Sequence, residues 1–371
     1  MKTFDNQKVC REVYKMRTVI ILFVLTLLSC QKTDENNIEL NTKDVQSQTP
    51  NAKTYPKLNS QNPLADIDLS TVLSPSDVTY LPTNSNTTST TEIAVIGDFG
   101  NDGAGSVGVA AMINDWAPYA IVTLGDNNYG DEGEMEEFQE FVGGYYCDFI
   151  YNPDAPEEFQ CNGMAADLEE NRFFPALGNH DIDYDPDNYY DYFTLPGNEE
   201  YYSQVIGAVE FFILNTSGSY SADLDEPDHE QAIWLEEALS NSDATWKIVC
   251  AHHPPYSTGR HSNFTDIQWP FEAWGADAYM SGHNHIYERI HKLSEPNMVY
   301  FVNGVGGHGL DECGEKPLDE GEEEDEENFE NHCYDEQYGA MLLTVNNTTL
   351  TFEFYSMDDG ENPIDTYTLT Q

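Results

Sequence analysis

Ile93-Ala-Val-Ile-Gly-Asp-Phe-Gly100 is a short apolar run that ends in Gly97-Asp98, a pattern that predicts a buried strand followed by a tight turn. The pattern recurs in four later segments, Ile121-Val-Thr-Leu-Gly-Asp126, Phe173-Phe-Pro-Ala-Leu-Gly-Asn-His-Asp181, Lys247-Ile-Val-Cys-Ala-His252 and Ala278-Tyr-Met-Ser-Gly-His-Asn-His285. Each strand therefore delivers carboxylate, amide or imidazole groups at its carboxyl end, where sites form in α/β sheets. Asp, Asn and His together make a mixed oxygen and nitrogen donor set that suits iron, manganese or zinc.

Each motif alone has a simpler explanation. A Gly-Asp pair after a strand is usually only a turn, and a single His-x-His is more often incidental than a metal site. All five motifs, in this order and each at a strand end, are hard to explain as turns. The sequence therefore predicts a metal centre assembled from five strand ends.

The ordered set of motifs resembles the calcineurin-like metallophosphoesterases over roughly residues 92–310. Gly125-Asp126-Asn-Asn-Tyr129 and Val249-Cys-Ala-His252 are similar to motifs of the purple acid phosphatase branch, and His261 matches a histidine of its small, tartrate-resistant type. This resemblance implies an α/β (α+β) fold, a four-layer sandwich of two mixed β-sheets flanked by helices. The metals are then expected between the sheets at one edge.

The resemblance also implies a dinuclear centre of Fe(III) with Fe, Zn or Mn(II). The first metal would be held by Asp98, Asp126, Tyr129 and His285, and the second by Asn179, His252 and His283, with Asp126 bridging both. A shared carboxylate keeps two cations about 3.5–4 Å apart, a span that clamps the attacking and leaving oxygens of a phosphoryl group. A metal-bound hydroxide is expected to attack phosphorus in line. His180 and His261 would contact the phosphoryl oxygens, and one of them would protonate the departing alkoxide.

Three neighbours of the motifs remain. We expect Asp181 to lie behind the ligands and orient a histidine. His253 and His308 are close to the motifs in sequence, but no role is predicted for either.

These expectations describe a dimetal acid phosphatase that hydrolyses small phosphomonoesters. A phosphodiesterase or nucleotidase on the same dimetal core is the alternative within this class. Outside the class, the chain could be a non-catalytic surface binding module that uses the acidic segment 311–330 as a calcium-dependent contact. Intact ligands at every motif argue against an inert core.

The composition is strongly acidic. Among 371 residues, 67 Asp and Glu face 15 Lys and Arg, for a formal net charge of -52. Binding to nucleic acid is not expected, because contacts to phosphate backbones need Lys and Arg. The 39% of hydrophobic residues suffices for one large core. The acidic segment 311–330 itself is predicted to be a solvated loop.

The amino-terminal region predicts export. Residues 1–30 would be a leader and lipoprotein signal peptide, with an apolar run from Val19 to Leu28 that is too short to span a bilayer. Met16 is an alternative start of translation, because residues 1–14 mix acidic and basic side chains. Leu27-Leu28-Ser29-Cys30 resembles a lipobox, which implies lipidation of Cys30 and an outer-membrane or cell-surface lipoprotein. An ordinary signal peptide with an incidental cysteine, giving a periplasmic or secreted protein, stays open. Residues 31–91 are polar and predict a disordered tether before a catalytic domain at 92–371.

The remaining cysteines predict two disulfides. Cys147 with Cys161 and Cys313 with Cys333 each bracket an acidic loop, and exported chains tolerate disulfides. Four reduced thiols or a crossed pairing are the alternatives. Cys250 lies inside an apolar strand and is expected to be a buried free thiol.

The other elements follow from periodicity. Helices are expected at 104–115, 133–142 and 228–239, the last with Asp228 as its N-cap. Two strands are expected between Tyr201 and Asn215, and further strands at 299–302, 340–345, 349–355 and 364–369. The early alternation of strand and helix and the β-rich end fit a layered α/β or α+β domain.

Overall fold

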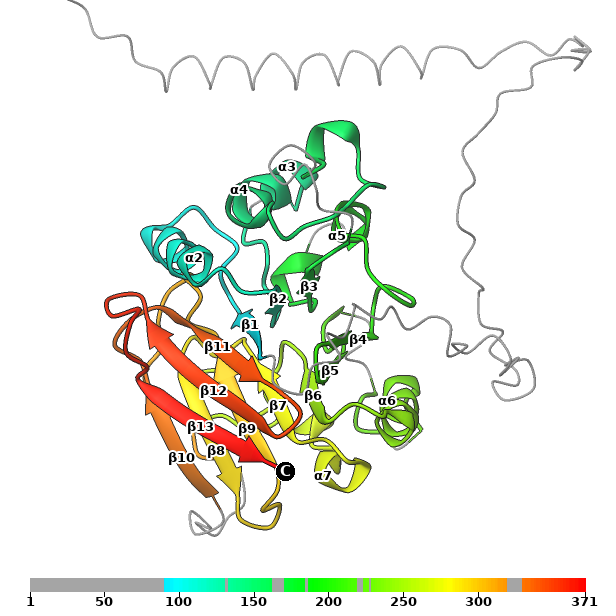
Figure 1. The fold of residues 1–371 in the computed structure, drawn as a ribbon, viewed down its shortest axis with the longest axis vertical. Coiled ribbons are helices and arrows are strands. Elements are labelled where there is room, and N and C mark those ends of the chain that lie inside the picture. The colour runs from blue at the N-terminus through cyan, green and yellow to red at the C-terminus, as the bar shows by residue number, and fades with distance from the viewer. Residues whose placement is uncertain are drawn as a thin grey trace, which may run out of the picture. The chain divides into compact units, whose positions relative to one another are not determined.

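Two mixed β-sheets organise the structure, a computed structural model that describes residues 90–130, 133–161, 170–183, 186–218, 223–226, 228–318 and 329–371 (Figure 1). The predicted leader, signal peptide, lipidated Cys30 and nearly all of the tether lie outside the described residues, as do residues 319–328 of the acidic segment. Among the helices in the described part of the chain, none combines the length and apolar character needed to cross a membrane.

The first sheet has six strands in the order β13-β12-β11-β1-β2-β3. β1, β2 and β3 run parallel, whereas β11, β12 and β13 form an antiparallel meander whose first strand pairs with β1. The parallel strands therefore bring their carboxyl ends to one edge of this sheet. The bounds in chain order are Thr91–Ile96 (β1), Ala120–Thr123 (β2), Phe173–Pro175 (β3), Gly339–Val345 (β11), Thr349–Ser356 (β12) and Asp365–Thr370 (β13).

The second sheet has seven strands in the order β10-β8-β9-β7-β6-β5-β4. Its centre, β5, β6, β7 and β9, is parallel, and antiparallel strands close both sides. The bounds are Tyr202–Ile206 (β4), Val209–Ile213 (β5), Trp246–Cys250 (β6), Ala278–Ser281 (β7), Tyr287–Lys292 (β8), Val299–Asn303 (β9) and Phe329–Tyr334 (β10).

The main core lies between the two sheets. Side chains of both sheets join one buried cluster, and Phe301 of β9 stacks on Phe352 of β12 with ring centroids 4.7 Å apart. The central strands are buried on both faces: in β5, Phe211 and Ile213 belong to this cluster, whereas Phe212 packs in a second cluster beneath α6 and α7. Two buried faces explain why these strands read as continuous apolar runs in the sequence.

Helices cover the outer face of each sheet, which confirms the expected four-layer sandwich. Val109 and Ile113 of α2 join the main core, whereas Leu235 and Leu239 of α6 join the second cluster. The helices are Ala104–Trp116 (α2), Met135–Phe138 (α3), Gly144–Tyr146 (α4), Pro186–Tyr192 (α5), Glu230–Asn241 (α6) and Phe271–Trp274 (α7), with a π-turn at Gln139–Gly143 and 3₁₀ turns at Glu157–Phe159, His180–Ile182 and Thr265–Ile267.

The helix boundaries correct two expectations. α6 is capped by His229 rather than Asp228, because the His229 side chain accepts a hydrogen bond from the backbone N–H of Gln231. The helix expected at 133–142 continues through the π-turn to Tyr146. Neither difference changes the layer to which the helix belongs.

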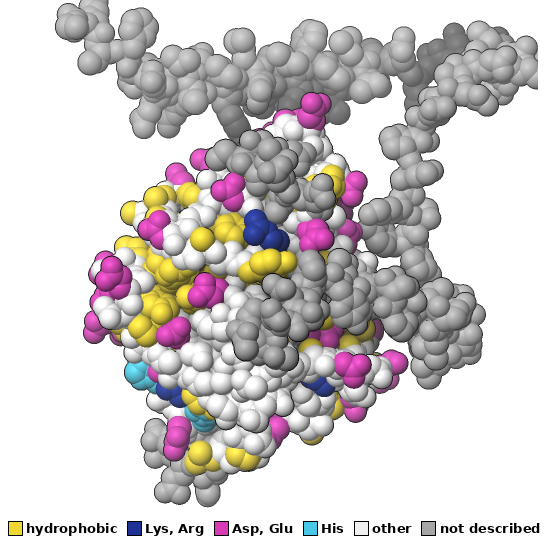
Figure 2. Space-filling model, viewed as in Figure 1, with side chains coloured by type: hydrophobic (Ala, Val, Ile, Leu, Met, Phe, Trp, Pro, Cys, Tyr) yellow, Lys and Arg dark blue, Asp and Glu magenta, His cyan; other side chains and the backbone are white. Residues whose placement is uncertain are grey.

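The cysteines pair as predicted. Disulfides join Cys147 to Cys161 and Cys313 to Cys333, and Cys250 is a buried free thiol. Figure 2 shows acidic side chains scattered over one face of the molecule with few Lys or Arg among them, in line with the composition.

Candidate metal centre

The structure brings together all seven residues that the resemblance assigns to metals. The first three motifs follow β1, β2 and β3 of one sheet, and the last two follow β6 and β7 of the other. Asp98 and Asp126 both adopt left-handed backbone conformations, with φ of 58° and 53°. Such strain in a non-glycine residue is a common feature of functional sites. Gly178 is also required, since an added Cβ would lie 2.1 Å from the Asp126 nitrogen.

One cluster of donor atoms gathers around Asp98. The Tyr129 hydroxyl donates to Asp98 Oδ1 over 3.1 Å and lies 3.2 Å from His285 Nε2, which is itself 3.4 Å from Asp98 Oδ1. Asp98 is fully buried, and its second oxygen accepts the backbone N–H of His283 at 2.9 Å. A carboxylate, a phenol and an imidazole thus present their donor atoms to one point.

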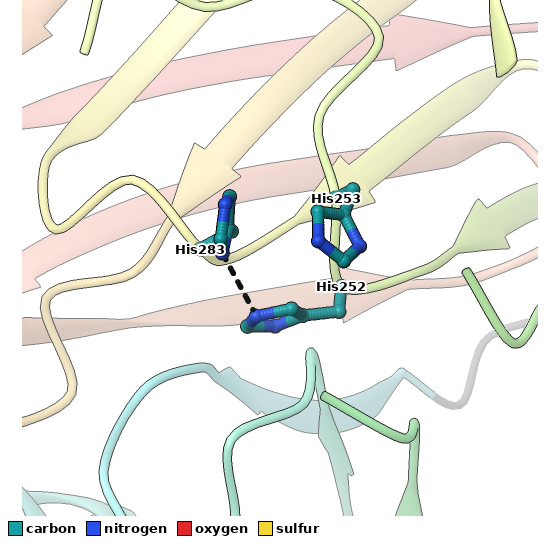
Figure 3. A group of neighbouring side chains, drawn as sticks. All are labelled: His252, His253 and His283. Atoms are coloured by element: carbon teal, nitrogen blue, oxygen red, sulfur yellow. Dashed lines mark hydrogen bonds between the residues drawn. The ribbon is translucent and has the colours of Figure 1, made fainter. Parts of the chain in front are cut away.

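A second cluster gathers around His252. Its Nε2 lies 3.2 Å from His283 Nδ1 (Figure 3). The same nitrogen is 3.0 Å from Asn179 Oδ1 and 3.4 Å from Asp126 Oδ1. Ligand atoms of Asp98, Asp126 and His252 also lie within 4.8 Å of one another, which brings Asp126 close to the first cluster. This carboxylate therefore lies between the two groups of donors, as a bridging ligand must.

The tautomer of His252 shows that the second cluster fits a cation. Its Nδ1 is 2.9 Å from the carbonyl oxygen of Leu124, which can only accept, so Nδ1 carries the proton. In the neutral ring the lone pair of Nε2 then faces two further acceptor oxygens and another ring nitrogen. These atoms are mutually compatible only with a proton or a metal ion between them. Accordingly, Asp126 and Asp98 outweigh burial and raise the pKa of His252.

The charges around Asp98 and Tyr129 lead to the same conclusion. Burial alone would raise the pKa of Asp98, but hydrogen bonding to His285 and the charges of His252 and His285 lower it. Burial, followed by the charges of Asp98 and Asp126, raises the pKa of the Tyr129 phenol well above its ordinary value. A phenolate at this position would therefore need strong compensating positive charge, such as a trivalent cation.

His180 and His261 lie at the rim of the clusters. The His180 backbone donates to Asp126 Oδ1 at 2.9 Å, while its ring is 44% exposed and lies 3.1 Å from Asp183. The exposed His261 ring packs 4.5 Å from that of His283. Both rings are therefore accessible to a molecule that binds at the clusters from solvent.

Asp181 differs from its predicted role. Its carboxylate accepts hydrogen bonds from the Asn127 side chain at 2.8 Å and from the backbone of Asn128 and Gly178 at 2.9 and 2.7 Å. It braces the loops of the second and third motifs and does not orient a histidine. Burial and the charge of Asp126 raise its pKa to about 7.

Two polar residues that we did not single out support the rim. Asn284, fully buried between the two histidines of the last motif, accepts the His261 backbone N–H at 2.7 Å and donates to Ser262 O at 3.2 Å. Asp311 accepts the His285 backbone N–H at 3.1 Å. The acidic segment is therefore attached to the site at its start, while Glu312 and Gly314 to Pro317 are exposed. The position of Asn284 inside a motif was its only signal.

His253 and His308 also belong to the site. Ring nitrogens of His252, His253 and His283 lie within 4.8 Å of one another, and His253 is held by Thr216 Oγ1 at 2.9 Å. Burial, then the charges of His252 and His261, lower the pKa of His253 to about 2, so its ring is neutral. His308 stacks on Tyr129. The closeness of His253 and His308 to the motifs in the sequence could have identified both as residues of the site.

Comparisons with known proteins agree with this geometry. The sequence model of calcineurin-like phosphoesterases matches residues 91–287, and that of the iron/zinc purple acid phosphatase-like protein C region matches residues 297–366. Purple acid phosphatase 15 of Arabidopsis thaliana is 25% identical over 62% of this chain and 47% of its own length. An acid phosphatase of Aspergillus ficuum is 32% identical over 36% of this chain and 25% of its own length.

This chain spans less than two thirds of the length of those relatives. A solved structure of GAP50, the anchor in the inner membrane complex of Plasmodium, shares the fold with a TM-score of 0.56. It is 16% identical and covers 76% of this chain and 89% of its own. With a family match that extends across all five motifs, the chain belongs to the calcineurin-like phosphoesterases, and its carboxyl-terminal region is of the purple acid phosphatase type.

Proposed function

We propose that the protein is a dimetal acid phosphatase that hydrolyses small phosphomonoesters. The observation that carries this proposal is the placement of Asp126 between the two donor clusters: its carboxylate lies 3.4 Å from His252 Nε2, and ligand atoms of Asp98, Asp126 and His252 lie within 4.8 Å of one another. Asp98, Tyr129 and His285 would hold one metal, and Asn179, His252 and His283 the other. Relatives named as acid phosphatases support the same activity.

The more buried residues of the site would bind the metals, and the exposed histidines at its rim would contact the substrate. Two bound cations would neutralise the phosphoryl charge and acidify water for attack on phosphorus. Tyr129 and Asp98 offer hard anionic oxygens, which favour Fe(III) in the first position, with Fe, Zn or Mn(II) in the second. His180 and His261, at the rim, are placed to donate to phosphoryl oxygens and to give a proton to the leaving group.

The test is turnover on a monoester and a diester by protein of known metal content. We expect the iron-loaded protein to favour the monoester and to show a visible charge-transfer band that Tyr129→Phe abolishes. Preference for the diester would replace the proposal by the phosphodiesterase or nucleotidase alternative. A colourless, active, iron-loaded protein would remove the purple acid phosphatase assignment and keep the dimetal one.

We also propose that the protein is exported as a lipoprotein anchored through Cys30. The support is the Leu-Leu-Ser-Cys sequence that ends the apolar run. Cys30→Ser should release the protein from the membrane fraction or leave it unprocessed. Normal membrane attachment of that variant would contradict the anchor and leave the ordinary signal peptide.

A further inference from the structure

His308 contacts every residue of the first donor cluster. Its imidazole stacks on the Tyr129 ring, with centroids 3.5 Å apart and planes 8° from parallel. The same ring meets His285 edge to face at 5.7 Å, and the His308 backbone N–H donates to the carbonyl of Asp98 at 3.1 Å. A single side chain therefore touches the rings of two proposed metal ligands, while its backbone is tied to the third.

The backbone that carries His308 is closely packed. Gly306 donates to Gly97 O at 3.0 Å, and an added Cβ on Gly306 would lie 2.2 Å from that oxygen. Gly307 has a φ of 149°, and a Cβ there would lie 2.2 Å from Ser106 Oγ at the start of α2. Because these glycines let the turn press against β1 and α2, the position of His308 is set by the core and not by its own side chain.

The other neighbours of the Tyr129 ring hold it less closely. His180 lies 4.6 Å away with its plane tilted by 45°, and its side chain is 44% exposed. His285 meets the ring edge-on at 6.3 Å. Hydrogen bonds reach only the phenol oxygen, and among the aromatic contacts of the ring the one with His308 is the closest and most nearly parallel.

We propose that His308 is a positioning residue for the first metal site: its ring packs against the Tyr129 ring and limits the sideways movement that would carry the phenol oxygen away from Asp98 and His285. This inference rests on the proposed dinuclear centre. Without the stacked ring, the Tyr129 side chain can swing about its Cα–Cβ bond, which moves the phenol oxygen, so the oxygen spends less time at the ligand position. Metal retention and the phenolate-to-iron absorption band should both respond, even though His308 is not itself a ligand.

The test compares the full chain, loaded with Fe(III) and Zn(II), with three variants. His308→Ala removes the stacked ring, and His308→Phe keeps a flat ring without nitrogens. His291→Ala is the matched control, because it removes a histidine that contacts Tyr367 at 4.9 Å at another place in the fold. Readouts are the visible band and the rate of metal loss to a chelator, measured by mass spectrometry.

We expect His308→Ala to shift and weaken the band and to lose metal about 3- to 10-fold faster, a range that corresponds to one aromatic pair. His308→Phe and His291→Ala should resemble the wild type. Equal bands and equal rates in the wild type and His308→Ala, or a His308→Phe variant as impaired as His308→Ala, would overturn the proposal.

The proposed function fails in a distinguishable way. A colourless wild type that still retains two metals defeats only the iron assignment, and the rate of metal loss then decides the role of His308. A wild type that retains no metal defeats the dinuclear centre and the inference together.

Discussion

His261 shows how a single exposed residue is positioned for chemistry. Its backbone is fixed by Asn284, and its ring lies against His283, so its exposure does not mean that it is unconstrained. We expect His261→Ala to lower turnover about 100-fold, the lower range for loss of a general acid, while both metals remain bound. Steady-state kinetics and metal analysis of the same sample would check this, with His332→Ala on β10 as control. Unchanged turnover, or loss of metal, would contradict the assigned role.

Glu288 provides a pH-dependent prediction away from the donor clusters. This fully buried carboxylate accepts hydrogen bonds from Ser257 Oγ, from the backbone and hydroxyl of Thr258, and from Asn331 Nδ2, at 2.8–3.3 Å. Burial outweighs these bonds and raises its pKa above the ordinary 4.5. The folded state therefore binds more protons than the unfolded state above pH 4.5, so this carboxylate makes the protein less stable as pH rises from 4.5 through its raised pKa.

Glu288→Gln removes this titratable group. It also replaces one of the two carboxylate oxygens by an NH₂ group, which cannot accept the hydrogen bonds that Ser257, Thr258 and Asn331 donate. We expect a loss of about 1–3 kcal/mol in the free energy of unfolding of the metal-free protein at pH 4.5. The difference in unfolding free energy between the wild type and Glu288→Gln should become smaller as pH rises, because ionisation of Glu288 destabilises only the wild type. Chemical denaturation at a series of pH values measures both quantities, and a deficit that widens with pH would contradict this account.

The convergence of the proposed ligand residues was predictable, and the residues that support them were not. Asp98, Asp126 and His252 follow strands whose apolar pattern is plain, so their convergence follows from parallel pairing. Asn284 and Asp311 act through hydrogen bonds to backbone groups distant in sequence, and no periodicity encodes such a bond. Asp181 was placed behind the site correctly, but its partners depend on how two loops fold together.

At the scale of elements, the two disulfides secure different parts of the chain. Cys147–Cys161 closes a segment that begins at the end of α4. Cys313–Cys333 links β10 to the segment that contains Asp311. The same segment is also held by a hydrogen bond from the backbone N–H of Lys316 to Thr258 O. Replacing both cysteines of the first pair by serine should cost about 3 kcal/mol of stability and leave turnover intact at low temperature. The same change in the second pair should also lower turnover, because Asp311 supports His285.

Thermal unfolding and turnover of the two double variants test this difference. Equal turnover in both would show that the segment of Asp311 keeps its place without the disulfide. If only the variant that lacks Cys147–Cys161 lost turnover, the first disulfide, and not the second, would support the site.

Most strands were predictable from buried apolar runs or regular alternation, whereas β8 and β10 were missed. β5, β6 and β7 consist of buried side chains and read directly from the sequence. β10 has exposed, polar residues along an edge, and β8 buries Glu288 where an apolar residue would be expected. A run of exposed polar residues and a buried charge both break the alternation on which a sequence-based assignment depends.

At the scale of the whole molecule, charge should control substrate binding. A formal net charge of -52 repels an anionic phosphate ester, so we expect KM to fall as ionic strength rises. Deleting residues 320–327, which lie outside the described residues, removes seven carboxylates and should lower KM at low salt while kcat stays within about threefold. A loss of kcat of about 100-fold would show that this segment helps to build the site.

The bridging role of Asp126 is the central claim, and one measurement tests it directly: metal content and monoester turnover determined together for the wild type and Asp126→Asn. Asp277→Asn is the matched control, since Asp277 lies at the opposite end of β7 and accepts the Lys247 backbone N–H at 2.8 Å. We expect two metals per chain and turnover in the wild type and control, and loss of at least one metal with turnover reduced about 100-fold or more in Asp126→Asn. Wild-type turnover with fewer than two metals, or an Asp126→Asn variant that keeps both metals and full turnover, would contradict the account.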